Sequence, residues 1–150
     1  MPDPGRRIGA GVSFYEIVNP AALGAPRGYN NGMLAPAGGR LLFVAGQIGW
    51  DEGQQIVSSS FVAQFEQALG NVVAVVREAG GGPEHIGRLT MYVVDKDVYV
   101  AALAEVGSAY QRQMGRHFPA MALVEVANLL EVGAQVEIEA TAVLPEETSK

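Results

Sequence analysis

Two glutamates, Glu137 and Glu139, stand two residues apart in an otherwise apolar stretch near the C-terminal end of the chain. Side chains alternate along a β-strand, so a strand here would carry both carboxylates on one face. One interpretation is a solvated pair at the edge of a sheet. The other is a partly buried glutamate at a cleft between subunits, where a carboxylate can take a proton from a water molecule. The residues around the pair leave both interpretations open.

A second candidate site lies where an apolar stretch ends in Ala45-Gly46-Gln47. Gly46 either lets a ligand approach the backbone or accommodates close strand packing. Tyr29 and Trp50 flank this region, and each is either a packing residue or a wall of a ligand site.

Several kinds of chemistry are excluded by composition. The chain has 150 residues, no cysteine and only two histidines, His85 and His117. It therefore lacks thiolate nucleophiles and the ligand spacing of zinc sites. It also lacks a phosphate-binding glycine motif, and we expect no metal and no cofactor. The net charge of −6 argues against nucleic acid as the main partner.

The elements that would position these residues follow from periodicity and from turn signals. We expect a single domain over residues 13–145, between a flexible N-terminal tail at 1–12 and a C-terminal tail at 146–150. Helices are predicted from Ser60 to Glu78 and from Asp95 or Asp97 to about His117. Strands are predicted at 13–19, within 28–34, at 40–50 with a hairpin return at 55–57, at 86–94, at 118–129 and at 134–143.

Two amphipathic helices can cover only one face of such a sheet. On the last strand, Val136 and Ile138 would face the helices. On the preceding strand we expect Met121, Leu123 and Glu125 on the uncovered face. That face would be too apolar for water and too charged for a closed core, which predicts a subunit interface.

Six segments then carry a family resemblance: A-G-Q-I-G-W-D-E-G, Q-F-E-Q-A-L-G-N-V, E-A-G-G, L-T-M-Y-V-V-D, F-P-A-M-A-L-V-E-V and V-E-I-E-A-T-A-V. Together they resemble the RidA/YjgF family of reactive intermediate (enamine/imine) deaminases, in the right order from Tyr29 to Val143. The resemblance implies a chorismate-mutase-like α+β fold, with a mixed sheet, two helices on one face and a homotrimer. It also implies small-molecule sites in clefts between subunits.

The resemblance further implies roles for individual residues. Active members hydrolyse enamines and imines to 2-keto acids and ammonia without a metal or cofactor. Carried over by motif, Tyr29 and the Gly46-Gln47 region bind substrate and Glu137 holds the catalytic water. The arginine that clamps the substrate carboxylate is replaced by Met121. A frequent cysteine is Leu123, and an asparagine of the second helix is Gly107.

Three functions compete. The first is a divergent deaminase of small, more apolar enamines or imines, with Tyr29, Met121, Leu123 and Trp50 forming the pocket. Arg116 is the nearest cation in sequence that would replace the missing clamp. The second is a non-catalytic trimer that binds a metabolite or a protein. The third and weakest is an endoribonuclease or translation inhibitor. The absence of an apolar leader predicts a soluble, cytoplasmic protein without a membrane partner.

Overall fold

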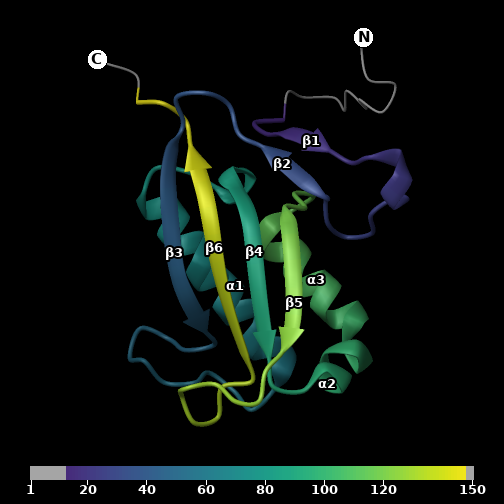
Figure 1. Cartoon of the computed structure of the whole chain (residues 1–150). Coiled ribbons are helices and arrows are strands. Elements are labelled where there is room, and N and C mark those ends of the chain that lie inside the picture. Colours follow the sequence, from purple (N-terminus) through teal and green to yellow (C-terminus); the bar gives the residue numbers. More distant parts are fainter. Residues whose placement is uncertain (1–12, 148–150) are drawn as a thin grey trace.

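A mixed four-stranded sheet forms the centre of the structure, a computed structural model that describes residues 13–147 (Figure 1). The strand order is β3–β6–β4–β5. The strands are β3 (Arg40–Ile48), β4 (Ile86–Val93), β5 (Ala120–Glu125) and β6 (Val136–Leu144). β4 and β5 run parallel, and β6 runs antiparallel to both β3 and β4. The expected α+β fold with a mixed sheet is confirmed.

Helices α1 (Phe61–Glu78), α2 (Lys96–Ala101) and α3 (Leu103–Met114) follow the strands. The hydroxyl of Ser60 accepts a hydrogen bond from the amide of Ala63, as an N-cap does, so the expected start of α1 is confirmed. Asp95 caps α2 through the amides of Asp97 and Val98. In Figure 1, α1 and α3 lie behind the sheet, on one face.

The second predicted helix is not continuous, which corrects the expectation of one helix from Asp95 to about His117. Ala102 has φ −107° and ψ 18°, and its amide bonds to the oxygen of Tyr99, so the backbone turns before α3 begins. The helix then ends at Met114, since Gly115 has a positive φ of 61°. Neither change removes the apolar stripe that packs on the core.

One apolar core lies between the helices and the sheet. From α1 it includes Phe65, Leu69, Val72 and Val76, and the sheet contributes Leu89, Met91, Val136 and Ile138. We call the side of the sheet that carries these core residues the helix face. The opposite side, which carries Phe43, Tyr92, Glu137 and Glu139, we call the open face. On β6 the burial alternates residue by residue, as the sequence predicts.

The predicted orientation of β5 is wrong. Met121 pairs with Leu89 and Leu123 pairs with Met91, so both lie on the helix face and pack against the core. Ala122 and Val124 therefore point to the open face. The strand is apolar on both sides, so alternation alone does not tell which side meets the helices, and only the parallel pairing with β4 decides it.

Smaller elements complete the chain. β1 (Glu16–Val18) and β2 (Gly32–Leu34) pair as a separate ribbon, and short 3₁₀ turns lie at Ala21–Leu23 and Pro83–His85. The expected return strand at 55–57 is only a single bridge between Trp50 and Ile56. The tail at 1–12 and residues 148–150 lie outside the described residues. Within the described part, every helix is too short or too polar to cross a membrane.

Candidate functional site

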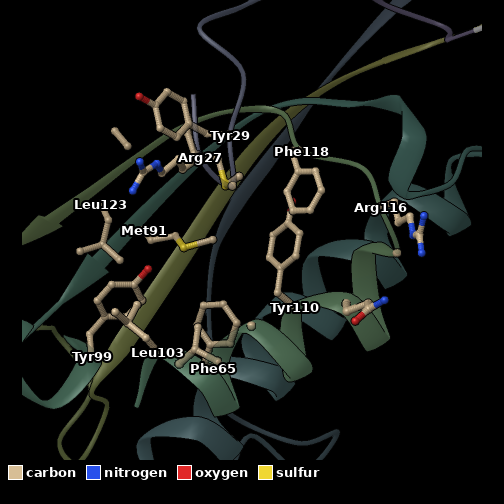
Figure 2. Close-up of a pocket in the computed structure, with 17 residues that line it drawn as sticks. Arg27, Tyr29, Phe65, Met91, Tyr99, Leu103, Tyr110, Arg116, Phe118 and Leu123 are labelled. Carbon is tan, nitrogen blue, oxygen red and sulfur yellow. The ribbon is translucent and has the colours of Figure 1, made fainter. Parts of the chain in front are cut away.

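A cavity of about 680 Å³ opens between α3, β5 and the loop that precedes β2 (Figure 2). Its walls are mostly apolar and aromatic: Phe65, Met91, Tyr99, Leu103, Val106, Tyr110, Phe118, Met121 and Leu123. The rings of Tyr110 and Phe118 are stacked with centroids 5.5 Å apart. A large apolar cavity with a few polar groups at its margin is the usual form of a small-molecule site.

The loop that carries Arg27 and Tyr29 is fastened to the start of β5. The amide of Asn30 donates to the oxygen of Pro119 at 3.2 Å, and its side-chain amide donates to the oxygen of Phe118 at 2.6 Å. Gly28 has a positive φ of 72°, which lets the chain turn between Arg27 and Tyr29. These contacts hold Arg27 and Tyr29 at the cavity.

Both expected β5 residues, Met121 and Leu123, line this cavity. Gly107 of α3 lines it as well, and a Cβ atom added at Gly107 would meet only open space. The cavity is therefore wider at that point than any other residue would leave it.

Two arginines, Arg27 and Arg116, are the cationic side chains of the cavity. Arg116 was expected from its place in the sequence, whereas sequence reasoning missed Arg27. Its only sequence signal is that it stands two residues before Tyr29. Within residues 13–147, neither arginine takes part in an ion pair.

Two tyrosines of the cavity, Tyr99 and Tyr110, have a raised pKa and are neutral donors. Burial raises the pKa of Tyr99 above its usual value, and burial raises that of Tyr110 as well. The hydroxyl of Tyr110 donates to the oxygen of His117 at 2.6 Å, so it is occupied within the fold. Tyr99 is half-buried, and among residues 13–147 its hydroxyl has no hydrogen-bond partner, so it is left to donate a hydrogen bond to a ligand.

A second cluster lies on the open face, around Glu137. A Cβ atom at Gly46 would overlap the carboxylate of Glu137, so the glycine makes room for that side chain. The pairing of β3 with β6 shifts between Val44 and Gln47, which is a bulge at this point. The side-chain amide of Gln47 donates to the oxygen of Ala45 at 3.2 Å. Gly46, Gln47 and Glu137 are therefore brought together.

Glu139 has a different environment from Glu137. Its Oε1 accepts a hydrogen bond from the hydroxyl of Tyr92 at 2.7 Å, and that bond is the main reason why the pKa of Tyr92 is raised. The two carboxylates thus differ: Glu139 is hydrogen-bonded to Tyr92 of the same chain, and Glu137 lies over Gly46.

Within one chain, the cavity and the cluster around Glu137 do not meet. Glu137 lies on β6 on the open face, whereas Met121 lies on β5 on the helix face, with β4 between them. Two strand spacings alone separate them by roughly 10 Å across the sheet. Trp50 lies apart from the cavity too, with its backbone bridged to Ile56 and its oxygen bonded to Asn71. In residues 13–147, no group of three or more acidic or histidine side chains is arranged to hold a metal ion.

Comparisons with known proteins agree with this fold. Residues 19–144 match the protein family described as Endoribonuclease L-PSP. A RutC family protein of Synechocystis is 34% identical over 132 residues, which cover 87% of this chain and 97% of that protein. A goat protein named 2-iminobutanoate/2-iminopropanoate deaminase is 32% identical over 125 residues, or 83% of each chain.

A crystal structure of a conserved Rid-family protein of unknown function from Yersinia pestis superposes with a TM-score of 0.77 at 30% identity. The match covers 87% of this chain and 99% of the Yersinia chain. The family match and these relatives span nearly all of the described fold, from β2 to β6. The chain therefore belongs to the RidA/YjgF family.

Proposed function

We propose that the chain is a hydrolytic deaminase of reactive enamine or imine metabolites, acting at clefts between the subunits of a homotrimer. The observation that carries this proposal is that one chain holds two parts of a site, the cavity and the cluster around Glu137, and keeps them apart. We call these two parts the half-sites. The cavity lies on the helix face, and Glu137 lies on the open face over Gly46. A cleft between two copies brings a carboxylate of one copy to the cavity of the next, which a single chain does not do. Relatives named as imine deaminases support the reaction class.

Exposed apolar side chains support assembly. On the open face Phe43 is 75% exposed and Leu41 is 59% exposed, and Val124 lies on the same face. In the loop between β5 and β6, Leu130 is fully exposed. Exposed apolar side chains thus stand on both edge strands of the open face, β3 and β5, and a second copy of the same chain is the partner proposed here to cover them. Sedimentation equilibrium at micromolar concentration is expected to give the mass of a trimer, and a monomer mass would contradict the assembly.

The proposed reaction needs only proton transfers and a bound water. The carboxylate of Glu137 orients a water molecule and takes its proton as the oxygen attacks the imine carbon. The C=N bond becomes a C–N single bond, and the nitrogen takes up a proton. The carbinolamine then collapses to a carbonyl with loss of ammonia. An enamine first takes a proton on carbon and becomes the imine. Tyr99 is placed to donate a hydrogen bond to the substrate in the cavity.

The test is ammonia release from several amino-acid-derived imines generated in the assay. Glu137→Gln is expected to lower kcat/KM by about 10²–10⁴-fold, because it removes the general base. Glu139→Gln is the matched control, since Glu139 lies two residues away on the same face and bonds to Tyr92. The control is expected to stay within about threefold of the wild type. Equal losses in both variants, or no hydrolysis by the wild type, would contradict the proposal.

A non-catalytic trimer that binds a ligand is the second candidate. It is favoured by the apolar walls of the cavity and by Met121, whose thioether cannot make the paired charge-assisted bonds of an arginine. Binding of apolar ligands without turnover of any imine would support it over the deaminase.

RNA cleavage is the weakest candidate. The chain is acidic, and both histidines make hydrogen bonds with the backbone: His117 with the oxygen of Ile86, and His85 with the amide of Gly82. Cleavage of RNA that falls steeply with salt and is lost in His117→Gln would favour it instead.

A further inference from the structure

The cavity is larger and more apolar than a two- or three-carbon imino acid requires. Its volume of about 680 Å³ lies within the range of about 300–1,000 Å³ that is typical for sites of drug-sized ligands. Phe65 and Val106, both buried, line its helix side together with Tyr99 and Leu103. Such walls gain most from a ligand with a bulky apolar or aromatic group, since binding energy grows with the apolar area removed from water.

Gly107 of α3 lines the same side of the cavity. It lies in the middle of α3, where glycine lowers helix stability relative to alanine. Its φ is not in the left-handed region and an added Cβ would touch nothing, so neither backbone geometry nor packing requires a glycine. The remaining consequence of Gly107 is space at the cavity wall.

Two arginines of the cavity are candidate partners for the anionic group of a ligand, and they lie on opposite sides of the cavity. Figure 2 shows Arg27 beside Tyr29 on the side of Leu123, whereas Arg116 lies across the cavity, beyond the stacked rings of Tyr110 and Phe118. The loop that carries Arg27 is fastened to the start of β5 by the bonds of Asn30 to Phe118 and Pro119. A ligand whose apolar group enters beside Tyr99 and Leu103 therefore meets Arg27 at the opposite margin, without passing the ring pair.

We propose that Arg27 binds the carboxylate of the ligand and that Gly107 admits a bulky apolar or aromatic side chain. The ligands of this chain are then amphiphilic carboxylates, and its substrates are the imines or enamines of large apolar amino acids. This inference rests on the proposed function in placing substrate in the same cavity. The carboxylate contact comes from the loop before β2 and not from β5, where Met121 offers no charge.

The experiment measures binding of stable probes by isothermal titration calorimetry, with three ligands: 3-phenylpropanoate, its neutral amide and propanoate. The variants are Arg27→Gln, Gly107→Leu and, as the matched control, Arg116→Gln. Thermal unfolding checks that each variant is folded. Gly107→Leu is expected to keep or gain stability, because leucine is a better helix former than glycine and a Cβ atom at this position meets no neighbour.

The wild type is expected to bind 3-phenylpropanoate at least about tenfold more tightly than the amide or propanoate. Arg27→Gln is expected to weaken the carboxylate by about tenfold or more and to leave the amide within about twofold, because only the charged ligand loses a charge-assisted bond. Gly107→Leu is expected to weaken both phenyl ligands and to leave propanoate unchanged. Arg116→Gln is expected to change none of them by more than about twofold.

The inference is overturned if Arg27→Gln has no effect, if Arg116→Gln has the larger effect, or if propanoate binds as tightly as the phenyl acid. Absence of binding by all three probes also overturns it. The outcome is separate from that of the hydrolysis assay. Probe binding in the expected pattern without turnover of any imine contradicts the deaminase but supports the ligand-binding roles of Arg27 and Gly107. Turnover combined with probe binding that does not depend on Arg27 or Gly107 supports the deaminase and contradicts those roles.

Discussion

At the scale of single residues, Met121 is the position at which the proposed deaminase lacks the carboxylate-binding arginine that the family resemblance implies. It lies in the cavity beside Leu123, on the helix face, where a guanidinium would meet mostly apolar walls. A buried charge without a partner is expensive, so an arginine at this position is stable only when a carboxylate pairs with it. A carboxylated substrate supplies that partner, and Arg27 already stands near the same cavity.

Met121→Arg is therefore expected to raise kcat/KM on carboxylated imines only modestly, by less than about tenfold. It is also expected to lower the free energy of unfolding of the ligand-free protein by about 1–3 kcal/mol. Met121→Gln is the control of similar length without charge. Vigorous turnover by the wild type that Met121→Arg abolishes would contradict this account of the cavity.

Gly46 acts on the site through Glu137. A Cβ at Gly46 would overlap the Glu137 carboxylate, so Gly46→Ala must move that side chain or the β3 bulge. We expect Gly46→Ala to lose about as much activity as Glu137→Gln and to lower the free energy of unfolding by about 1–3 kcal/mol, a usual effect of overpacking. Full activity in Gly46→Ala, measured by ammonia release, would show that the position of Glu137 is not critical.

His117 makes stability depend on pH. Burial lowers its pKa below the usual 6.5, although its bond to the oxygen of Ile86 and the charge of Glu84 act the other way, and His85 adds to the lowering. The folded state thus binds a proton less readily than the unfolded chain. Its contribution to stability is full above pH 6.5 and is lost as pH falls from there through the lower folded pKa.

Urea unfolding at about pH 7.5 and about pH 5.5 checks this. The wild type is expected to lose stability at the lower pH, and His117→Gln is expected to lose less because it has no group to protonate there. Identical losses in both proteins would place the pH dependence elsewhere.

At the scale of elements, α1 shows what sequence patterns reveal and what they miss. Its bounds and its Ser60 cap follow from local signals and are confirmed. Gln64, however, is a fully buried polar residue in the helix. Its amide donates to the oxygens of Ser58 and Gly133, and its oxygen accepts from the amide of Gln135. These bonds fasten the loop before β6 to α1, and no local sequence pattern predicts them.

Gln64→Leu is expected to lower the free energy of unfolding by about 2–4 kcal/mol, because it leaves three backbone groups without their partner. Gln67→Leu is the matched control on the same helix, since among residues 13–147 the side chain of Gln67 bonds only to Asn71. Its effect is expected to stay within about 1 kcal/mol. Chemical denaturation measures both, and equal effects would mean that the bonds of Gln64 add little.

The same contrast explains the errors in the predicted site. Periodicity separates the two faces of β5 but does not say which face meets the helices, because Met121 and Val124 are both apolar. The division of the second helix at Ala102 has no glycine or proline to mark it. Arg27 becomes a cavity residue only through the bonds of Asn30 to Phe118 and Pro119, which join positions far apart in the sequence. Local patterns predict elements, and tertiary contacts decide their faces.

At the scale of the whole molecule, the account depends on two half-sites that one chain keeps apart. The cavity opens on the helix side between α3 and β5, and Glu137 lies on the open face among exposed apolar residues of β3. In a closed ring of three copies, each cavity has one neighbour that can supply Glu137. A trimer that mixes a variant without Glu137 and a variant with a filled cavity therefore contains some sites in which both the cavity and Glu137 are intact.

Subunit complementation tests this most directly. Glu137→Gln and Gly107→Phe, each expected to be nearly inactive in hydrolysis of an imine with a large aromatic side chain, are unfolded together in equal amounts and refolded. Random assembly then gives an intact cavity next to an intact Glu137 at about one site in four, so the account predicts about a quarter of wild-type activity. The same variants refolded separately and then assayed in one tube without subunit exchange serve as the control. Activity in the co-refolded sample no higher than in this control would contradict a site shared between subunits.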